Sequence, residues 1–215
     1  MPATSAGTTE YVMPRTPSIP SRRDREYDSL TAKRRSEVRP MSDTQTMTYT
    51  LNQFAADIRA ALKADPGPAA KATVGRYVSR ALTDPAFVAT HLKDRASGAS
   101  PREILYEDPE LGFCICGHVY DGPANGSPHD HGESWAIYGQ ATGVTEMTDW
   151  KIVERGTPGK PNLVEPVRTY EMKPGDAHFY DVGDVHSPRR AAGCKLIRIE
   201  GKNLDHVKRS HIKAK

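Results

Sequence analysis

The sequence predicts a mainly β protein in which a short N-terminal helical segment leads into a barrel or sandwich of short strands. Segments with strand character fill residues 102–200 and are separated by glycine, proline and aspartate breakers. Apolar residues at helical spacing precede them, in residues 47–95. No run of about 18 apolar residues occurs, so a membrane-spanning helix is not expected.

Residues 47–95 are expected to form the helical segment. The apolar residues of the first helix recur three or four positions apart, at Leu51, Phe54, Ile58 and Leu62. This pattern predicts an amphipathic helix over residues 52–63, which an Asp-Pro-Gly-Pro breaker ends. A second helix carries Val74 and Val78 on its apolar face. A third begins at Asp84, an N-cap residue that precedes a proline at the first helical position.

Seven strands are expected in residues 96–215, which form the barrel and make one domain with the helices. Each strand is short and is bounded by turn residues. The expected strands cover residues 103–107, 112–120, 134–140, 143–152, 164–172, 177–182 and 196–200. Arg189 and Arg190, which lie between the last two strands, are expected in a solvated turn.

Residues 1–46 are expected to be a disordered leader. The first 40 residues contain ten serines and threonines and five prolines, without apolar periodicity. They carry eight basic and five acidic residues, whereas the remaining 175 residues carry 22 of each. The net charge of +3 therefore lies in the leader. Since no DNA-reading motif accompanies it, no nucleic-acid partner is expected.

Cysteine usage indicates a reducing environment. The three cysteines cannot form a closed disulfide framework. Met1 is not followed by a basic stretch and an apolar stretch, so a secretory signal is not expected. We therefore expect a cytoplasmic protein without a membrane partner. Cys114 and Cys116 are expected to be buried free thiols, because a zinc site would need a second cysteine pair.

The strongest chemical signal is a group of three histidines. His129 and His131 are separated by one residue, so on an extended segment their side chains point to the same side and can bind one metal. His186 follows a glycine-containing turn that returns the chain toward the same place. The sequence therefore predicts a metal site made of these three imidazoles.

Three polar residues close to these histidines have weaker signals. Glu133 is expected to be a solvated loop carboxylate rather than a base near the metal. His178 and Tyr180 alternate on the strand that approaches the third histidine. For this pair, holding a ligand in position and packing in the core both remain open.

The two histidine-bearing segments resemble the paired motifs of the cupin superfamily. The residues that match the second motif at its full spacing are Gly175, Gly183 and His186, with an aspartate in place of the motif's proline. Those that match the first motif are His129, His131 and Gly143. The resemblance implies a double-stranded β-helix barrel with a metal in the barrel mouth, held by the three histidines.

The glutamate ligand of the first motif is absent, since Trp135 and Ala136 occupy its positions. Three neutral imidazoles leave a divalent metal its full charge and open positions, which favours an anionic ligand such as a thiolate. A three-histidine set resembles that of the cysteine dioxygenase-like thiol dioxygenases, and small bacterial cupins described as predicted metal-dependent enzymes are the closest group. The resemblance covers roughly residues 102–200 and implies iron(II) as the metal.

Three further residues fall where this resemblance places substrate-binding or pocket-facing residues, and a fourth is a competing candidate. Arg102 stands near the family's substrate-carboxylate arginine, and an ion pair with an acid is the alternative. Arg198 competes for the same role, and pairing with Glu200 is its alternative. His118 and Tyr120 fall at pocket-facing positions, and one wall of a packed core is the alternative. Arg198 and Glu200 replace the Ser-His-Tyr relay of the cysteine enzymes.

Together these features predict a mononuclear non-haem iron(II) dioxygenase that oxidises the thiol of a small carboxylate-bearing substrate to a sulfinate with O2. The alternatives are a metal-dependent cupin enzyme that acts on a non-thiol substrate and a cupin metabolite-binding module. Imidazole also suits zinc, copper and nickel, so iron rests on the resemblance. A monomer and a homodimer are both compatible with the sequence.

Overall fold

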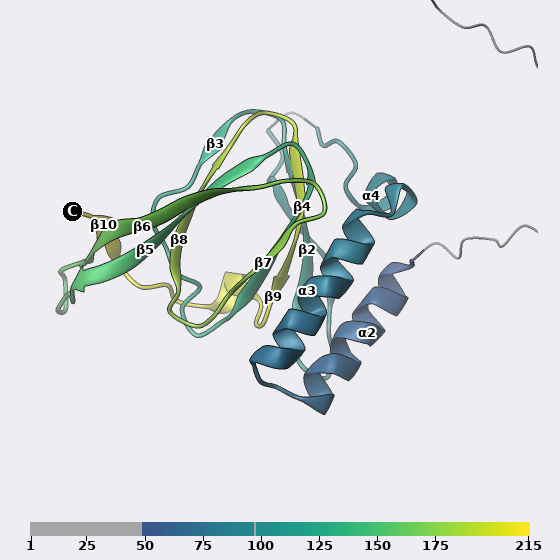
Figure 1. The fold of residues 1–215 in the computed structure, drawn as a ribbon, viewed down its shortest axis with the longest axis horizontal. Coiled ribbons are helices and arrows are strands. Elements are labelled where there is room, and N and C mark those ends of the chain that lie inside the picture. Colours follow the sequence, from purple (N-terminus) through teal and green to yellow (C-terminus); the bar gives the residue numbers. More distant parts are fainter. Residues whose placement is uncertain (1–48, 97) are drawn as a thin grey trace, which may run out of the picture. The chain divides into compact units, whose positions relative to one another are not determined.

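The computed structural model describes residues 49–96 and 98–215, so the predicted leader over residues 1–46 lies outside the described residues. Within them, three helices precede ten strands (Figure 1). The helices are α2 (Leu51–Ala64), α3 (Pro68–Leu82) and α4 (Pro85–His91). The first sheet contains, in spatial order, β1 (Arg102–Glu107), β2 (Cys114–Tyr120), β9 (Cys194–Glu200), β4 (Ala136–Thr142) and β7 (Ala177–Tyr180). The second contains β10 (Ile212–Ala214), β6 (Asn162–Met172), β5 (Thr145–Glu154), β8 (Val185–Arg190) and β3 (Ala124–Asn125).

The chain passes back and forth between the two sheets. After β4 in the first sheet, β5 and β6 lie in the second, β7 in the first, β8 in the second and β9 in the first. Neighbouring strands are antiparallel except for the parallel pair of β10 and β6. The two curved sheets face each other (Figure 1), as in a double-stranded β-helix barrel. The predicted fold class, a mainly β cupin-type barrel with a short helical segment, is therefore confirmed.

The two faces of the first sheet have different surroundings, because alternate residues of a strand point to opposite faces. Its outer face is apolar and belongs to one buried cluster with residues of the helices. The outward members include Ile115, Val119, Ile137, Ile197 and Ile199. Its inner face lines the barrel, where a second buried cluster joins residues of both sheets. That cluster contains Ala136, Tyr138, Met147, Met172, Tyr180 and Leu196.

Helix α3 lies directly on the outer face of β4, and a glycine permits the close approach. A Cβ added to Gly139 would lie 2.2 Å from Cγ1 of Val78 and 2.5 Å from Cδ1 of Leu82. Real Cβ atoms do not approach so closely, so any side chain here would displace the helix. The glycine is thus a packing requirement of the helix–sheet contact.

Local sequence signals explain where the helices begin. Thr50 and Gln53 form a reciprocal capping box at the start of α2. The carboxylate of Asp84 accepts hydrogen bonds from the backbone N–H groups of Ala86 and Phe87, which confirms its predicted role as the N-cap of α4. An ion pair also connects α2 to the residue that follows β1. Nε of Arg59 in α2 donates to the buried carboxylate of Asp108 across 2.7 Å.

The seven predicted strands all occur, with ends shifted by at most two residues, whereas β3, β8 and β10 were not predicted. The turn expected at Arg189 and Arg190 is wrong, and of the two only Arg189 is exposed to solvent as expected. Both residues belong to β8, and Arg190 is buried with its guanidinium 4.7 Å from the ring centroid of Tyr120. The strand was missed because its inward-pointing positions are His186, Pro188 and Arg190 rather than apolar residues, so no period-two hydrophobic pattern is present.

All three cysteines are buried free thiols, as predicted for Cys114 and Cys116. Burial raises the pKa of each of these two thiols to about 12, so both are protonated at neutral pH. In the part of the chain that the structure describes, no helix is both long enough and apolar enough to cross a membrane.

Candidate metal centre

The three predicted histidine ligands come together between the two sheets, where His186 of β8 contacts Tyr138 of β4. His186 lies on β8, and His129 pairs with it as an isolated antiparallel bridge with two backbone hydrogen bonds of 3.0 Å. His131 follows two residues later on the same side. One ligand atom from each histidine lies within 4.8 Å of those of the other two. Among the described residues, this is the one group of three or more histidine, cysteine or acidic side chains able to hold a metal.

Backbone carbonyls set the orientation of two of the rings. Nδ1 of His129 lies 2.8 Å from the carbonyl oxygen of Ser127, and Nδ1 of His186 lies 3.3 Å from that of Asp184. Because a carbonyl oxygen only accepts, both Nδ1 atoms are donors, and the lone pair of each neutral ring lies on Nε2. This arrangement is typical of histidines that ligate a metal through Nε2.

Burial keeps the three imidazoles neutral. Desolvation lowers the pKa of His129 to about 4 and that of His131 to about 2. Desolvation and the two neighbouring histidines lower the pKa of His186 further still. A metal ligand must be deprotonated, so all three side chains are ready to bind at neutral pH. A set of three neutral nitrogen donors fits a divalent iron, zinc, copper or nickel ion.

The carboxylates near the triad are engaged elsewhere. Asp130, between the two histidines of the pair, accepts backbone hydrogen bonds from Gly132 and Ser210. Asp149 lies opposite His186 in the β5–β8 register, but its carboxylate binds Nε of Arg168 at 2.6 Å. The donor set described by the structure is therefore three imidazoles without an acidic ligand, in agreement with the absent glutamate of the first motif.

A tyrosine that sequence reasoning missed completes the centre. The hydroxyl of Tyr138, on β4, lies 3.1 Å from Nε2 of His131 and 3.4 Å from Nε2 of His186. Arg198 lies opposite it in the β4–β9 register, and its Nη1 donates to the same hydroxyl across 3.2 Å. The available signal was alternation, since Tyr138 shares the inward face of its strand with Ala136. Without the strand register, however, its distance from the histidines was unknown.

The buried carboxylate of Glu200 holds the Arg198 side chain in place. Its Nε donates to Oε1 of Glu200 across 2.8 Å, and its Nη2 binds the same oxygen. Nε and Nη2 of Arg102 donate to the two oxygens of Glu200 across 3.1 and 2.8 Å. Burial alone would raise the pKa of the Glu200 carboxyl, but the two guanidinium groups hold it at about 2. A continuous polar chain thus runs from Arg102 through Glu200, Arg198 and Tyr138 to the triad.

The structure places the two predicted substrate arginines differently. Besides Glu200, Arg102 binds the carboxylate of Asp205 at 2.9 and 3.0 Å, which is the ion-pair alternative for this residue. Its contact with substrate stays a prediction. Arg198 is also paired with Glu200, yet its Nη1 points to the Tyr138 hydroxyl beside the triad. Of the two, Arg198 is the one that the structure brings to the centre.

His118 and Tyr120 lie on the inward face of β2, on the same side as Cys114 and Cys116, as period-two alternation predicted. Nδ1 of His118 lies 3.3 Å from the Tyr120 hydroxyl. Burial lowers the pKa of His118 well below its usual value, and its Nε2 has no partner among the described residues. The pair forms part of the barrel wall, and its contact with a substrate stays a prediction.

The structure also gives the surroundings of Glu133 and of the pair His178 and Tyr180. Glu133 is exposed and pairs with Lys202 at 3.2 Å, so the solvated loop position is confirmed. The ring of Tyr180 stacks on His186 with centroids 3.8 Å apart, and its hydroxyl binds that of Tyr170 at 2.6 Å. Tyr180 therefore supports a ligand ring directly, whereas His178 packs beside Tyr170 and Tyr180.

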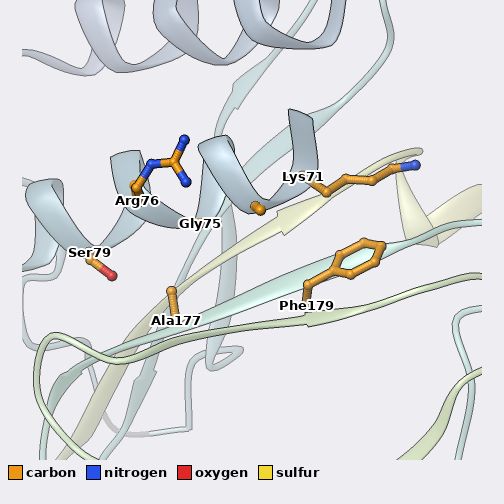
Figure 2. Close-up of a pocket in the computed structure, with 7 residues that line it drawn as sticks. Lys71, Gly75, Arg76, Ser79, Ala177 and Phe179 are labelled. Atoms are coloured by element: carbon orange, nitrogen blue, oxygen red, sulfur yellow. The ribbon is translucent and has the colours of Figure 1, made fainter. Parts of the chain in front are cut away.

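A groove of about 410 Å³ lies on the other side of the first sheet, between α3 and β7. Figure 2 shows Ala177 and Phe179 of β7 facing Gly75 and Lys71 of α3. In β7, these two residues alternate with His178 and Tyr180, which point to the barrel interior. The groove is thus separated from the metal centre by the thickness of the sheet.

Comparison with solved structures finds cupin and double-stranded β-helix proteins. KdgF from Halomonas sp. has 18% identity and a TM-score of 0.39, with 54% of this chain and 94% of that chain covered. An uncharacterized conserved protein with a double-stranded β-helix domain from Klebsiella pneumoniae has 11% identity and a TM-score of 0.40, with 58% and 88% covered. A cupin superfamily protein from Desulfitobacterium hafniense has 10% identity and a TM-score of 0.38, with 52% and 84% covered. At these identities the similarity concerns the fold alone.

No protein-family model and no curated protein matches the sequence. Of the three neighbours, one is described as a cupin superfamily protein and one as a protein with a double-stranded β-helix domain, and the resemblance to the cysteine dioxygenase-like family stays a prediction.

Proposed function

We propose that the protein is a mononuclear non-haem iron(II) dioxygenase that converts the thiol of a small carboxylate-bearing substrate to a sulfinate. The observation that carries this proposal is the donor set of three neutral imidazoles beside a buried arginine. The usual oxygenase set of two histidines and one carboxylate would reduce the charge of the metal. With three histidines the full charge is retained, and an anionic ligand such as a thiolate is favoured.

Bound iron(II) would supply a Lewis acid that favours the thiolate form of the substrate, and a site where sulfur and O2 meet. The overall reaction is balanced as RSH + O2 → RSO2H. Sulfur loses four electrons, O2 accepts them, and both oxygen atoms form bonds to sulfur. No external reductant is required, so the protein needs to bind, orient and exclude water rather than supply electrons.

The chain's own residues fit these tasks. Glu200 holds Nε and Nη2 of Arg198, so this guanidinium is fixed with Nη1 directed at the centre. Its positive charge favours a substrate carboxylate next to the triad. The interior beside it is lined by buried apolar side chains, including Met147, Met172 and Leu196. Such walls exclude water and strengthen the attraction between an anionic substrate and the centre.

One observation favours a second function, a metal-dependent cupin enzyme with a non-thiol substrate. Arg198 and Arg102 already share the carboxylate of Glu200, so neither presents a free two-pronged fork to a substrate carboxylate. A substrate held by the metal alone would need no such fork.

Oxygen consumption after anaerobic reconstitution with iron(II) separates these functions. We expect uptake of O2 with cysteine, 3-mercaptopropionate or mercaptosuccinate, matched by an equal amount of sulfinate detected by mass spectrometry. The matched controls are the corresponding hydroxy acids, which have oxygen in place of sulfur and should give no uptake. Stoichiometric iron without thiol-dependent uptake would contradict the proposal and favour the non-thiol enzyme.

A further inference from the structure

The hydroxyl of Tyr138 lies on the metal-facing side of the triad. The Nδ1 atom of His186 is committed to the carbonyl of Asp184, so Nε2 is the atom that this ring offers to a metal. The Tyr138 hydroxyl lies 3.4 Å from that Nε2 and 3.1 Å from Nε2 of His131. A residue that merely supports a ligand from outside would contact the other ring nitrogen. Tyr138 instead contacts the nitrogen of His186 that would bind the metal, and it contacts Nε2 of His131, whose Nδ1 has no partner among the described residues.

These separations are those of neighbouring ligand atoms around one ion. With metal–ligand bonds of about 2.1 Å, two ligand atoms lie about 3.0 Å apart at a right angle and about 3.4 Å apart at the tetrahedral angle. The two distances from the Tyr138 oxygen match this range. An ion bound to both Nε2 atoms on the side of the hydroxyl would have the Tyr138 oxygen as a neighbouring donor.

The hydrogen bonds at this oxygen are incomplete in a way that a cation would complete. The hydroxyl accepts from Nη1 of Arg198, and it has one proton to donate. Nε2 of His186 competes for that proton with Nε2 of His131 in the His131 tautomer that leaves this nitrogen unprotonated. In that tautomer one of the two nitrogens is left without it. A cation between the three atoms satisfies both nitrogens and the oxygen, while the phenolic proton leaves to solvent.

We propose that Tyr138 supplies a fourth, oxygen ligand to the metal, an inference that rests on the proposed three-histidine centre. Arg198 is its positioning residue, because the guanidinium lies 3.2 Å from the phenolic oxygen. Its positive charge compensates that of a bound phenolate, so the centre as a whole keeps the positive charge that favours a thiolate. Glu200 holds Arg198 in this orientation. The chain therefore replaces the missing acidic ligand with a tyrosine from the neighbouring part of the same strand.

This ligand narrows the substrate class. Four protein ligands would leave room at the metal for a sulfur atom and O2, but not for a further substrate atom. A thiol acid that binds through sulfur alone fits these positions, whereas a substrate that also binds through its amine does not. We therefore expect 3-mercaptopropionate or mercaptosuccinate to be oxidised in preference to cysteine.

A charge-transfer band tests the ligand independently of turnover. A phenolate bound to iron(III) absorbs visible light, whereas three histidines alone give no such band. We expect the band in the wild-type chain loaded with iron(III), and we expect Tyr138→Phe to abolish it. This variant should keep one iron per chain, with affinity reduced at least 10-fold. Tyr180→Phe is the matched control and should keep the band, because the Tyr180 ring stacks on His186 while its hydroxyl binds Tyr170.

The outcomes separate this inference from the proposed function. Stoichiometric iron without the band overturns the tyrosine ligand and leaves the three-histidine centre standing. The band without thiol oxidation supports the ligand and contradicts the dioxygenase. Loss of the band in Tyr180→Phe but not in Tyr138→Phe also overturns the assignment. If Tyr138→Phe does not fold, the tyrosinate ultraviolet difference signal on adding zinc to the wild-type chain decides, and its absence overturns the inference.

Discussion

Glu200→Gln exchanges a buried carboxylate for an amide of almost the same size, so it tests the charge at this position rather than the packing. The side chain is fully buried between the guanidinium groups of Arg102 and Arg198. Glutamine can accept one of these hydrogen bonds but offers no negative charge. The variant therefore leaves two buried or half-buried cations facing each other without their shared anion.

The magnitude follows from two independent estimates. The pKa of Glu200 is lowered from its usual value of 4.5 to about 2. One pKa unit corresponds to about 1.4 kcal/mol, so the ionised carboxylate contributes about 3 kcal/mol to stability. Removing one partner of a buried ion pair costs about 3–5 kcal/mol in other proteins. We therefore expect Glu200→Gln to lower the free energy of unfolding by about 3 kcal/mol at pH 7.

The stability difference between wild type and Glu200→Gln should depend on pH in a defined direction. Because the carboxyl pKa is lower in the folded chain, the contribution is complete above the unfolded value of 4.5 and is lost as the pH falls toward about 2. Urea unfolding should show a constant gap between wild type and Glu200→Gln from about pH 7 to 5. Below that, the gap should narrow by about 1.4 kcal/mol per pH unit. Glu165→Gln, in an exposed pair with Lys215, is the control and should change stability by less than about 0.5 kcal/mol. A gap below 1 kcal/mol at pH 7, or one that does not narrow in acid, would refute the reasoning.

Three further substitutions test the helical layer by urea unfolding. Gly139→Ala should destabilise the fold by about 1–3 kcal/mol, because its Cβ would lie 2.2 Å from Val78, and an unchanged stability would show that α3 can shift freely. Gly75→Ala, in the same layer but with no atom within 4 Å of the added Cβ, should stabilise by up to about 1 kcal/mol, and a loss would contradict the open position. Asp108→Ala removes the buried partner of Arg59 and should cost about 2–3 kcal/mol, whereas a neutral result would mean that this ion pair does not anchor α2.

The fold was predictable wherever hydrophobic period and cap chemistry agree. The helix predicted over residues 52–63 is α2, and Asp84 caps α4 as its sequence indicated. Strand β8 was missed because its inward residues are polar and serve the site rather than the core. A strand that carries metal-binding residues has histidine and arginine at inward positions where a strand of the core has valine. Its hydrophobic pattern is therefore weak, and sequence periodicity does not reveal it.

The candidate site was predictable only in part, because sequence spacing shows which residues share a strand face but not which strands are neighbours. The His-x-His pair and His186 were found from spacing and from the resemblance. The contact of Tyr138 with Arg198 depends on the pairing of β4 with β9, which are more than fifty residues apart in sequence. Arg102 matched a family position, yet its neighbours Glu200 and Asp205 lie far along the chain and determine its contacts.

The metal content of the reconstituted chain tests the central claim most directly. Anaerobic incubation with iron(II), removal of free metal and elemental analysis should give one iron per wild-type chain. His186→Ala should retain almost none while keeping its circular dichroism, and His178→Ala, which removes a barrel histidine outside the triad, should retain the metal. A wild-type chain without iron, or His186→Ala with stoichiometric iron, would contradict a metal centre at His129, His131 and His186.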